Sequence, residues 1–155
     1  MPLRNPKELP PSGKIAALDV GEKTIGVATS DHSRLIATPI TTLQKGKWKA
    51  VSAALNELTQ KEQITCFVVG LPLHMSGETS PSADRAMSVA HQLEEDLGLP
   101  VLLWDERLTT KAAESALFEH RQGKQTRMSK KDAKQHVDSV AASLILQGVL
   151  EALRF

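Results

Sequence analysis

Three acidic residues, Asp19, Glu106 and Asp138, occupy positions at which a carboxylate could do chemistry. Asp19 interrupts the apolar segment 14–20, and Glu106 comes just after the apolar segment 101–104; both segments have the composition of buried strands. In open α/β sheets, ligands bind beyond the carboxyl ends of the strands. The carboxylates of Asp19 and Glu106 are therefore predicted to lie at one edge of a sheet.

Asp138 belongs to a predicted helix that begins near Lys130. That start is too far away for the aspartate to cap the helix or to feel the helix dipole strongly. Asp138 shares a helical stripe with Ala141, Ala142 and Ile145, and this apolar face is expected to pack on the sheet. Because an unpaired carboxylate is costly on a buried face, Asp138 is predicted to point toward the edge of the core.

Three carboxylates at one edge of a sheet repel each other and raise at least one pKa, unless a cation lies between them. Oxygen ligands without a nearby cluster of histidines or cysteines favour Mg²⁺ or Mn²⁺ over zinc. Two such ions about 4 Å apart can activate a water molecule and stabilise the leaving oxygen of a phosphodiester. Asp19, Glu106 and Asp138 are therefore predicted to bind Mg²⁺ or Mn²⁺ and to be the catalytic residues of a nuclease.

Each of these acids also has an ordinary structural interpretation. Asp19 could form a turn with the glycine that follows it. Glu106 could pair with Arg107 on the surface, and Asp138 could pair with Lys134 one helical turn away. No single acid decides between the interpretations, and it is their joint placement that favours catalysis.

A basic segment lies between residues 120 and 134, and Arg127, Lys130 and Lys131 are among its cations. The segment leads into the helix that carries Asp138, which favours binding of nucleic-acid phosphates through charge and counterion release. The alternative is a solvated loop. Aromatic residues make up 3% of the chain and tyrosine is absent, so base stacking is not expected to dominate binding.

The elements that must position these residues follow from the spacing of apolar side chains. The predicted strands are Lys14–Val20, Thr24–Ser30, Leu35–Leu43, Ile64–Val69 and Val101–Trp104, and the predicted helices are 48–62, 87–97, 109–119 and 130–153. A tight turn joins the first two strands, which should pair antiparallel, whereas the later alternation of strands and helices implies parallel pairing. The sequence therefore predicts an α/β fold with a mixed sheet flanked by helices.

Length and composition are those of one globular domain. The chain has 155 residues, of which 41% are hydrophobic and 24% charged, and we expect a flexible, proline-rich tail over residues 1–13 before a single domain over residues 14–155. The net charge of +1 means that any attraction to nucleic acid must come from a local patch. The lone Cys66 is predicted to be a buried apolar residue, which suits a reducing cytoplasm, and no segment has the length of a membrane helix.

Four motifs in order resemble those of the YqgF family of pre-16S rRNA nucleases, once described as Holliday junction resolvases. The resemblance covers residues 14–150 and rests on the segments Asp19–Ala28 with Ser30-Asp31, Gly70–Leu73 to Gly77, Asp105–Thr110, and His136–Asp138 before Ala141-Ala142 and Leu144–Gln147. It implies a ribonuclease-H-like, five-stranded sheet of order 3-2-1-4-5 in a cytoplasmic bacterial protein. It also implies a divalent-metal-dependent hydrolase that matures the 5′ end of 16S rRNA, acting on pre-16S rRNA or a pre-ribosomal particle.

Carried over to this chain, the family's acidic trio falls on Asp19, Glu106 and Asp138. Lys23 and Arg107 fall where substrate phosphates are expected.

The chain departs from the family pattern at two positions. Thr24 stands where an arginine is common, and Ser139 stands where alanine is usual. The threonine puts one phosphate contact in doubt and leaves the three acids unchanged.

Three other functions remain open from the sequence. Resolution of branched DNA requires two active sites and hence a homodimer, whereas rRNA processing suits a monomer or a homodimer. A non-catalytic RNA-binding assembly factor would keep the fold and the basic segment, although the intact acids count against it. An actin-like or sugar-kinase ATPase needs two lobes to close over ATP, whereas one lobe is expected from 155 residues, and an absence of ATP binding or hydrolysis would dispose of this function.

Overall fold

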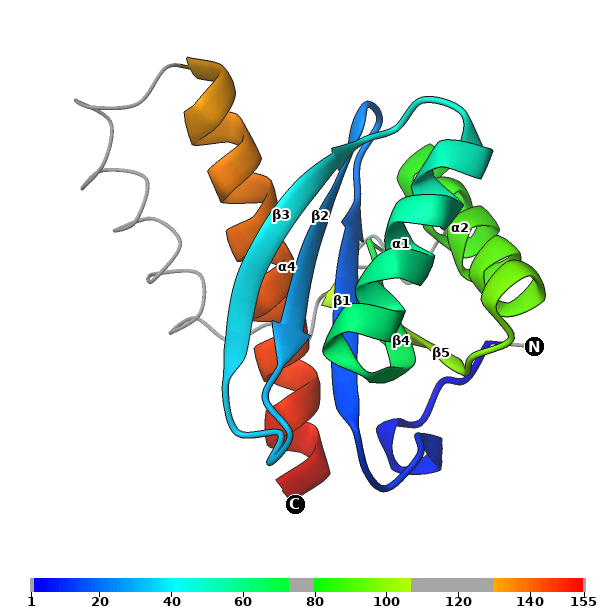
Figure 1. The fold of residues 1–155 in the computed structure, drawn as a ribbon, viewed down its shortest axis with the longest axis vertical. Helices are drawn as coiled ribbons and strands as arrows, with labels where there is room; N and C mark the ends of the chain where they lie inside the picture. The colour runs from blue at the N-terminus through cyan, green and yellow to red at the C-terminus, as the bar shows by residue number, and fades with distance from the viewer. Residues whose placement is uncertain (1, 73–79, 107–129, 155) are drawn as a thin grey trace.

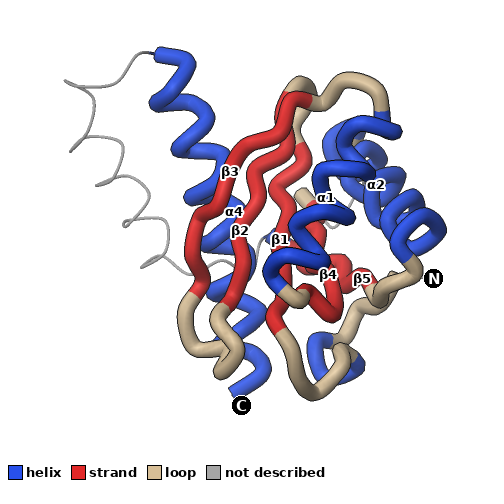
Figure 2. The backbone as a smooth tube through the Cα atoms, viewed as in Figure 1, coloured by secondary structure: helices blue, strands red, loops and turns tan. Residues whose placement is uncertain are grey.

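A five-stranded mixed sheet forms the centre of the molecule (Figures 1 and 2). The fold comes from a computed structural model that describes residues 2–72, 80–106 and 130–154, the last with side chains from residue 137 onward. The strands are β1 (Lys14–Val20), β2 (Thr24–Ser30), β3 (Ala37–Gln44), β4 (Ile64–Leu71) and β5 (Val101–Asp105). Their order across the sheet is β3-β2-β1-β4-β5, which confirms the fold class and strand order.

Strand directions follow the connections that the sequence predicts. β1 pairs antiparallel with β2, and β2 pairs antiparallel with β3, because short turns join them. β1 pairs parallel with β4, and β4 pairs parallel with β5, because a helix lies in each connection. The carboxyl ends of β1, β4 and β5 therefore meet at one edge of the sheet, together with the start of β2.

Helices cover both faces of the sheet (Figure 1). α1 (Trp48–Glu62) and α2 (Pro81–Leu97) lie on one face, and α4 (Lys130–Arg154) crosses the other. α2 begins where the Ser80 side chain accepts a hydrogen bond from the backbone N–H of Ala83, and it ends at Gly98, which has a left-handed φ of 68°. The predicted helix over 109–119 lies outside the described residues.

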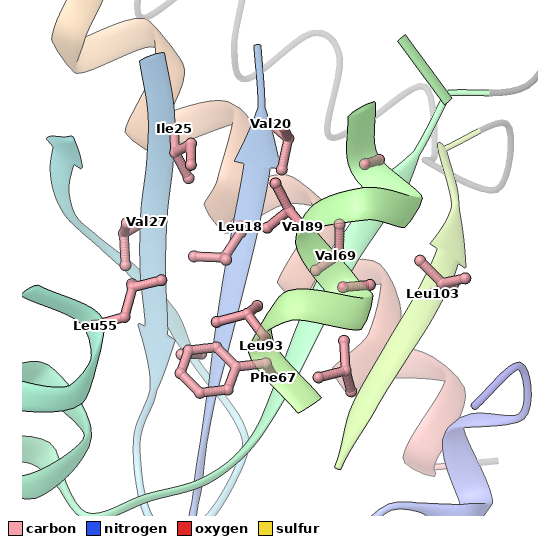
Figure 3. Close-up of a cluster of buried hydrophobic side chains, with 14 of the residues drawn as sticks. Leu18, Val20, Ile25, Val27, Leu55, Phe67, Val69, Val89, Leu93 and Leu103 are labelled. Carbon is pink, nitrogen blue, oxygen red and sulfur yellow. The ribbon is translucent and has the colours of Figure 1, made fainter. Parts of the chain in front are cut away.

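The alternation of side chains along β1 decides which face each residue serves. Leu18 and Val20 pack with α1 and α2, and Figure 3 shows them among Leu55, Val89 and other buried side chains of that cluster. Ala17 belongs to the second cluster, which packs against α4. Since successive side chains of a strand point to opposite faces, Asp19 lies on the α4 face.

Residues 2–13 differ from the expected flexible tail, because two leucines anchor them. The backbone N–H of Leu3 donates to the carbonyl of Val101 at 2.7 Å, and the carbonyl of Leu3 accepts from the N–H of Leu103 at 2.9 Å, so the segment pairs with β5. Leu9, which follows the short 3₁₀ helix Pro6–Glu8, is 6% exposed. The prolines suggested a disordered tail, but the leucines between them bury enough apolar surface to fix it.

Smaller differences concern the ends of elements. β3 begins at Ala37 rather than Leu35, and β4 continues through Gly70 to Leu71. Cys66 is fully buried, as predicted, and burial raises the pKa of its thiol. Among the helices of the described ranges, none is long and apolar enough to cross a membrane.

Candidate active site

Asp19 lies one residue before the end of β1, half-buried between the sheet and α4. Its cross-strand partner on β2 is Gly26, which has no side chain to cover the carboxylate. Burial raises the pKa of Asp19 to about 6, and the negative charge of Asp138 adds to the rise. The carboxylate is therefore held partly out of water and within electrostatic reach of a second acid.

Glu106 follows β5 directly and lies over the backbone of β4. A Cβ at Gly70 would lie 2.6 Å from Ile145 Cδ1 and 2.8 Å from Glu106 Oε1, so the glycine leaves room for the ends of both side chains. Burial raises the pKa of Glu106 to about 7, with further contributions from the charges of Asp19 and Asp105. Asp19 is thus electrostatically coupled to both other members of the predicted trio.

Asp138 reaches the site from α4, and two residues of β2 fix its position. The Thr24 hydroxyl donates a hydrogen bond to Asp138 Oδ2 at 2.8 Å. A Cβ at Gly26 would lie 2.0 Å from the carbonyl oxygen of Asp138, so only glycine allows the helix backbone to approach the strand this closely. The glycine inside β2 is explained by the approach of the helix that carries the acid.

All three acids lie at the same edge of the sheet, on β1, after β5 and on α4. All of its donor atoms are carboxylate oxygens, the ligands that Mg²⁺ and Mn²⁺ prefer. Within the part of the chain that the structure describes, no group of three or more His, Cys, Asp or Glu side chains stands close enough to hold a metal ion. Metal binding by the three acids therefore stays a prediction.

The predicted phosphate contacts lie only partly within the described structure. Lys23 is exposed in the turn between β1 and β2, close in sequence to Asp19. Lys130 and Lys131 are in the first turn of α4, but their side chains lie outside the described residues. Arg107 and Arg127 also lie outside them.

Thr24 is the site residue that sequence reasoning missed. The sequence singled out Thr24 only because an arginine is common at this position of the family pattern. In the structure its hydroxyl orients the carboxylate of Asp138. Strand alternation carried the signal, because Ile25 packs with α1 and α2 and so places Thr24 on the α4 face, which Asp19 shares. The hydrogen bond itself required the position of α4, which no local pattern provides.

Comparison with known proteins agrees with this arrangement. Residues 13–152 match the family described as "RuvX: Holliday junction resolvase". A protein of Paracoccus denitrificans is 43% identical over 147 residues, which are 95% of this chain and 89% of the relative. A protein of Rhodobacter capsulatus is 44% identical over 145 residues, covering 94% of this chain and 87% of the relative. Both relatives carry the name "Putative pre-16S rRNA nuclease".

Solved structures show the same fold at low sequence identity. The RuvC protein of Thermus thermophilus in complex with a Holliday junction superposes with a TM-score of 0.54 at 14% identity, covering 85% of this chain and 91% of that chain. The yeast mitochondrial Holliday junction resolvase gives a TM-score of 0.51 at 12% identity, covering 94% of this chain and 82% of that chain.

The fold and the family are those of ribonuclease-H-like nucleases, which hydrolyse phosphodiester bonds. Within that class the chain belongs to the RuvX family, which confirms the resemblance drawn from its motifs.

Proposed function

We propose that residues 14–155 form a single divalent-metal-dependent nuclease domain that cleaves pre-16S rRNA during maturation of its 5′ end. The observation that carries the proposal is the coupling of half-buried carboxylates at the sheet edge, where Asp19 feels the charge of Asp138 and Glu106 feels the charge of Asp19. Relatives more than 40% identical over nearly the whole chain carry the pre-16S rRNA nuclease name, which supports this substrate. The substrate in turn implies the bacterial cytoplasm.

The donor chemistry of the three acids, and the burial of two of them, support binding of a divalent cation. Burial of Asp19 and Glu106 disfavours their charged forms, and the raised pKa values express the cost of holding the two negative charges there. A cation bound by Asp19, Glu106 and Asp138 would relieve that cost, and the donor set selects Mg²⁺ or Mn²⁺. When bound, such an ion polarises the scissile phosphate and lowers the pKa of a water molecule.

The chain's own residues position the acids and the phosphates of the substrate. Thr24 fixes the carboxylate of Asp138, and Gly70 leaves the space in which Glu106 lies. In the metal-free chain the pKa of Glu106 is about 7, and a cation held by the three acids would favour its charged, metal-binding form. We assign phosphate contacts to Lys23, Arg107, Arg127, Lys130 and Lys131, whose cations flank the three acids in the sequence.

Resolution of branched DNA is the second candidate function, favoured by the family description and by the fold shared with junction resolvases. It requires two active sites on one substrate and hence a homodimer. A chain that stays monomeric at assay concentration and cleaves a single-stranded precursor would exclude this function, whereas rRNA processing is compatible with either oligomeric state.

The deciding experiment compares a precursor RNA spanning the 5′ end of 16S rRNA with a synthetic four-way DNA junction. Each is incubated with Mg²⁺, with Mn²⁺ or with EDTA, for the parent chain, Asp138→Asn and the exposed-acid control Glu95→Gln. We expect RNA cleavage that EDTA and Asp138→Asn abolish and that the control retains. If the chain instead cleaves the four-way junction in preference to the RNA, its function is resolution of branched DNA.

No cleavage of either substrate, together with tight RNA binding, would indicate a non-catalytic assembly factor. The basic segment is tested separately with the double variant Lys130→Ala and Lys131→Ala. An unchanged dependence of RNA affinity on salt would show that these two lysines do not contact phosphate.

A further inference from the structure

A second group of cations lines a cavity on the other face of the sheet. The cavity measures about 160 Å³ and lies where the connection between β3 and α1 meets α2; its lining includes Ile25, Lys45, Trp48, Arg85, Ser88 and Gln92. That volume has room for several water molecules. The cavity is thus large enough for a small polar group, and two positive charges stand at it.

This cavity lies at the same end of the sheet as the three acids. Lys45 Nζ donates to the carbonyl of Gly21 at 3.2 Å, and Gly21 lies two residues after Asp19. Ile25, on the cavity wall, pairs with Val20 at the end of β1. A chain of phosphates that reaches Asp19 can therefore continue round the turn between β1 and β2 toward Lys45.

Lys45 and Arg85 are like charges held close together. The pKa of Lys45 is lowered by burial first and by the positive charge of Arg85 second, while the carboxylate of Glu22 offsets part of that effect. Two cations repel at this range, and bringing them together in a protein costs free energy unless an anion compensates. The pair is therefore suited to bind an anionic group.

One hydrogen-bond donor of Arg85 is unsatisfied among the described residues. Its guanidinium donates from one terminal nitrogen to Ser82 Oγ at 3.1 Å. Its Nε is buried and has no hydrogen-bond partner among the described residues. A guanidinium presents its N–H groups in a planar fork that matches two oxygens of a phosphate, so an oxygen in the cavity would satisfy the buried donor.

We propose that Lys45 and Arg85 form a phosphate-binding subsite that holds a backbone phosphate of the nucleic-acid substrate away from the scissile bond. The proposal rests on the nuclease function proposed above. It extends the substrate path from the α4 face, where the acids lie, to the face covered by α1 and α2. The exposed Lys23, in the turn between the two faces, adds positive charge along that path.

The test measures binding without cleavage, so that catalysis does not enter. In EDTA, fluorescence anisotropy follows the affinity of a labelled single-stranded precursor RNA as salt rises from 50 to 200 mM. The variant is Lys45→Ala with Arg85→Ala, and the matched control is Lys49→Ala with Lys61→Ala, which removes two exposed charges from α1. Thermal melting first shows that both are folded. If the test variant melts lower, Lys45→Gln with Arg85→Gln, which keeps hydrogen-bonding ends, replaces it.

Each neutralised phosphate contributes about 0.7 to the salt slope of a single strand, so loss of the one phosphate held by Lys45 and Arg85 lowers the slope by about 0.7. Over this fourfold range of salt, the affinity of the parent should change about 2.6-fold more than that of the test variant. The control should keep the slope of the parent. A test variant whose slope equals that of the control overturns the proposal.

Two further outcomes separate this subsite from the proposed function. If the parent itself binds neither the precursor RNA nor the junction DNA, both the proposed nuclease function and the subsite are rejected. If the parent binds RNA and the test variant binds it equally, only the subsite fails. Inorganic phosphate that stabilises the parent but not the test variant, with unchanged RNA slopes, would assign the cavity to a free small anion and overturn the nucleic-acid assignment.

Discussion

Substitution of Gly26 by alanine tests whether the close approach of α4 to β2 positions Asp138, the aspartate to which we assign a catalytic role. The new Cβ would lie 2.0 Å from the carbonyl oxygen of Asp138 and 2.4 Å from its carbonyl carbon. Both atoms belong to helix backbone, which cannot rotate away as the end of a side chain can. To restore a separation of 3.0 Å, α4 and β2 must move apart by about 1 Å.

Two effects of known size follow from that displacement. Overpacking of a well-packed contact costs about 1–3 kcal/mol of the free energy of unfolding. For a chain of this length, each kcal/mol lowers Tm by about 2–4 °C. A misplacement of about 1 Å in an active site lowers the rate by about 100-fold. The alanine variant should therefore melt lower and lose far more activity than its stability loss explains.

The assays are thermal melting and the rate of RNA cleavage under single-turnover conditions in Mn²⁺. Gly46→Ala is the matched control for stability, because a Cβ at Gly46 meets nothing within 4 Å. The control should melt at or slightly above the parent, since alanine reduces the entropy of the unfolded chain. A Gly26→Ala variant with the Tm and the cleavage rate of the parent would refute the reasoning.

Three other perturbations follow from the same structure. Thr24→Val removes the hydroxyl that orients the aspartate on α4 and should lower the cleavage rate constant while Thr24→Ser retains most of it; equal rates for both variants would exclude a positioning role for the hydroxyl. The pKa values of Asp19 and Glu106 rise on folding, from 3.8 to about 6 and from 4.5 to about 7, so the native metal-free chain holds more protons than the unfolded chain between about pH 4 and pH 7. The free energy of unfolding, measured with urea, should therefore fall as pH rises through that window, and a flat profile would contradict the burial of these carboxylates. Leu9→Ala should cost about 2 kcal/mol or more because the side chain is 6% exposed, whereas Leu35→Ala, at a site 53% exposed, should cost little; equal melting temperatures would show that residues 2–13 do not stabilise the domain.

Most of the sheet could be predicted from local patterns. β1 and β2 match their predicted bounds because each is a run of apolar residues ended by polar turn residues, and α1 matches because its apolar positions recur at helical spacing. The edge strand β3 was less well bounded, since its exposed Ile40 and mixed polar face give a weaker alternation. The strand order came from the family resemblance rather than from these patterns.

The site was predictable only at the level of its acids. Carboxylates interrupting apolar segments identified Asp19 and Asp138 as unusual, because their residue types conflict with their surroundings. The Thr24 hydrogen bond and the glycines at 26 and 70 depend on how α4 and Glu106 pack over the sheet. Those contacts join residues far apart in the sequence, so no window of neighbouring residues contains the information.

The N-terminal segment illustrates a different limit. Four prolines within residues 1–13 indicate an irregular backbone, and that expectation is consistent with the short 3₁₀ helix found there. An irregular backbone need not be flexible. Here the backbone of Leu3 forms hydrogen bonds with β5, and the side chain of Leu9 is buried, so the segment is held against the domain. Their partners on β5 and α4 come about 90 or more residues later, beyond the reach of a local pattern.

The most direct test of the account is the single-turnover cleavage rate of Asp19→Asn in Mn²⁺ on precursor 16S RNA, beside Glu95→Gln as an exposed control. The substitution removes the negative charge that couples the three acids and nearly preserves the side-chain volume. Since changes to residues behind metal ligands already cost about 10–100-fold in affinity or activity, loss of a ligand should lower the rate by more than about 100-fold. A folded Asp19→Asn chain that cleaves at the parent rate would contradict the assignment of the active site.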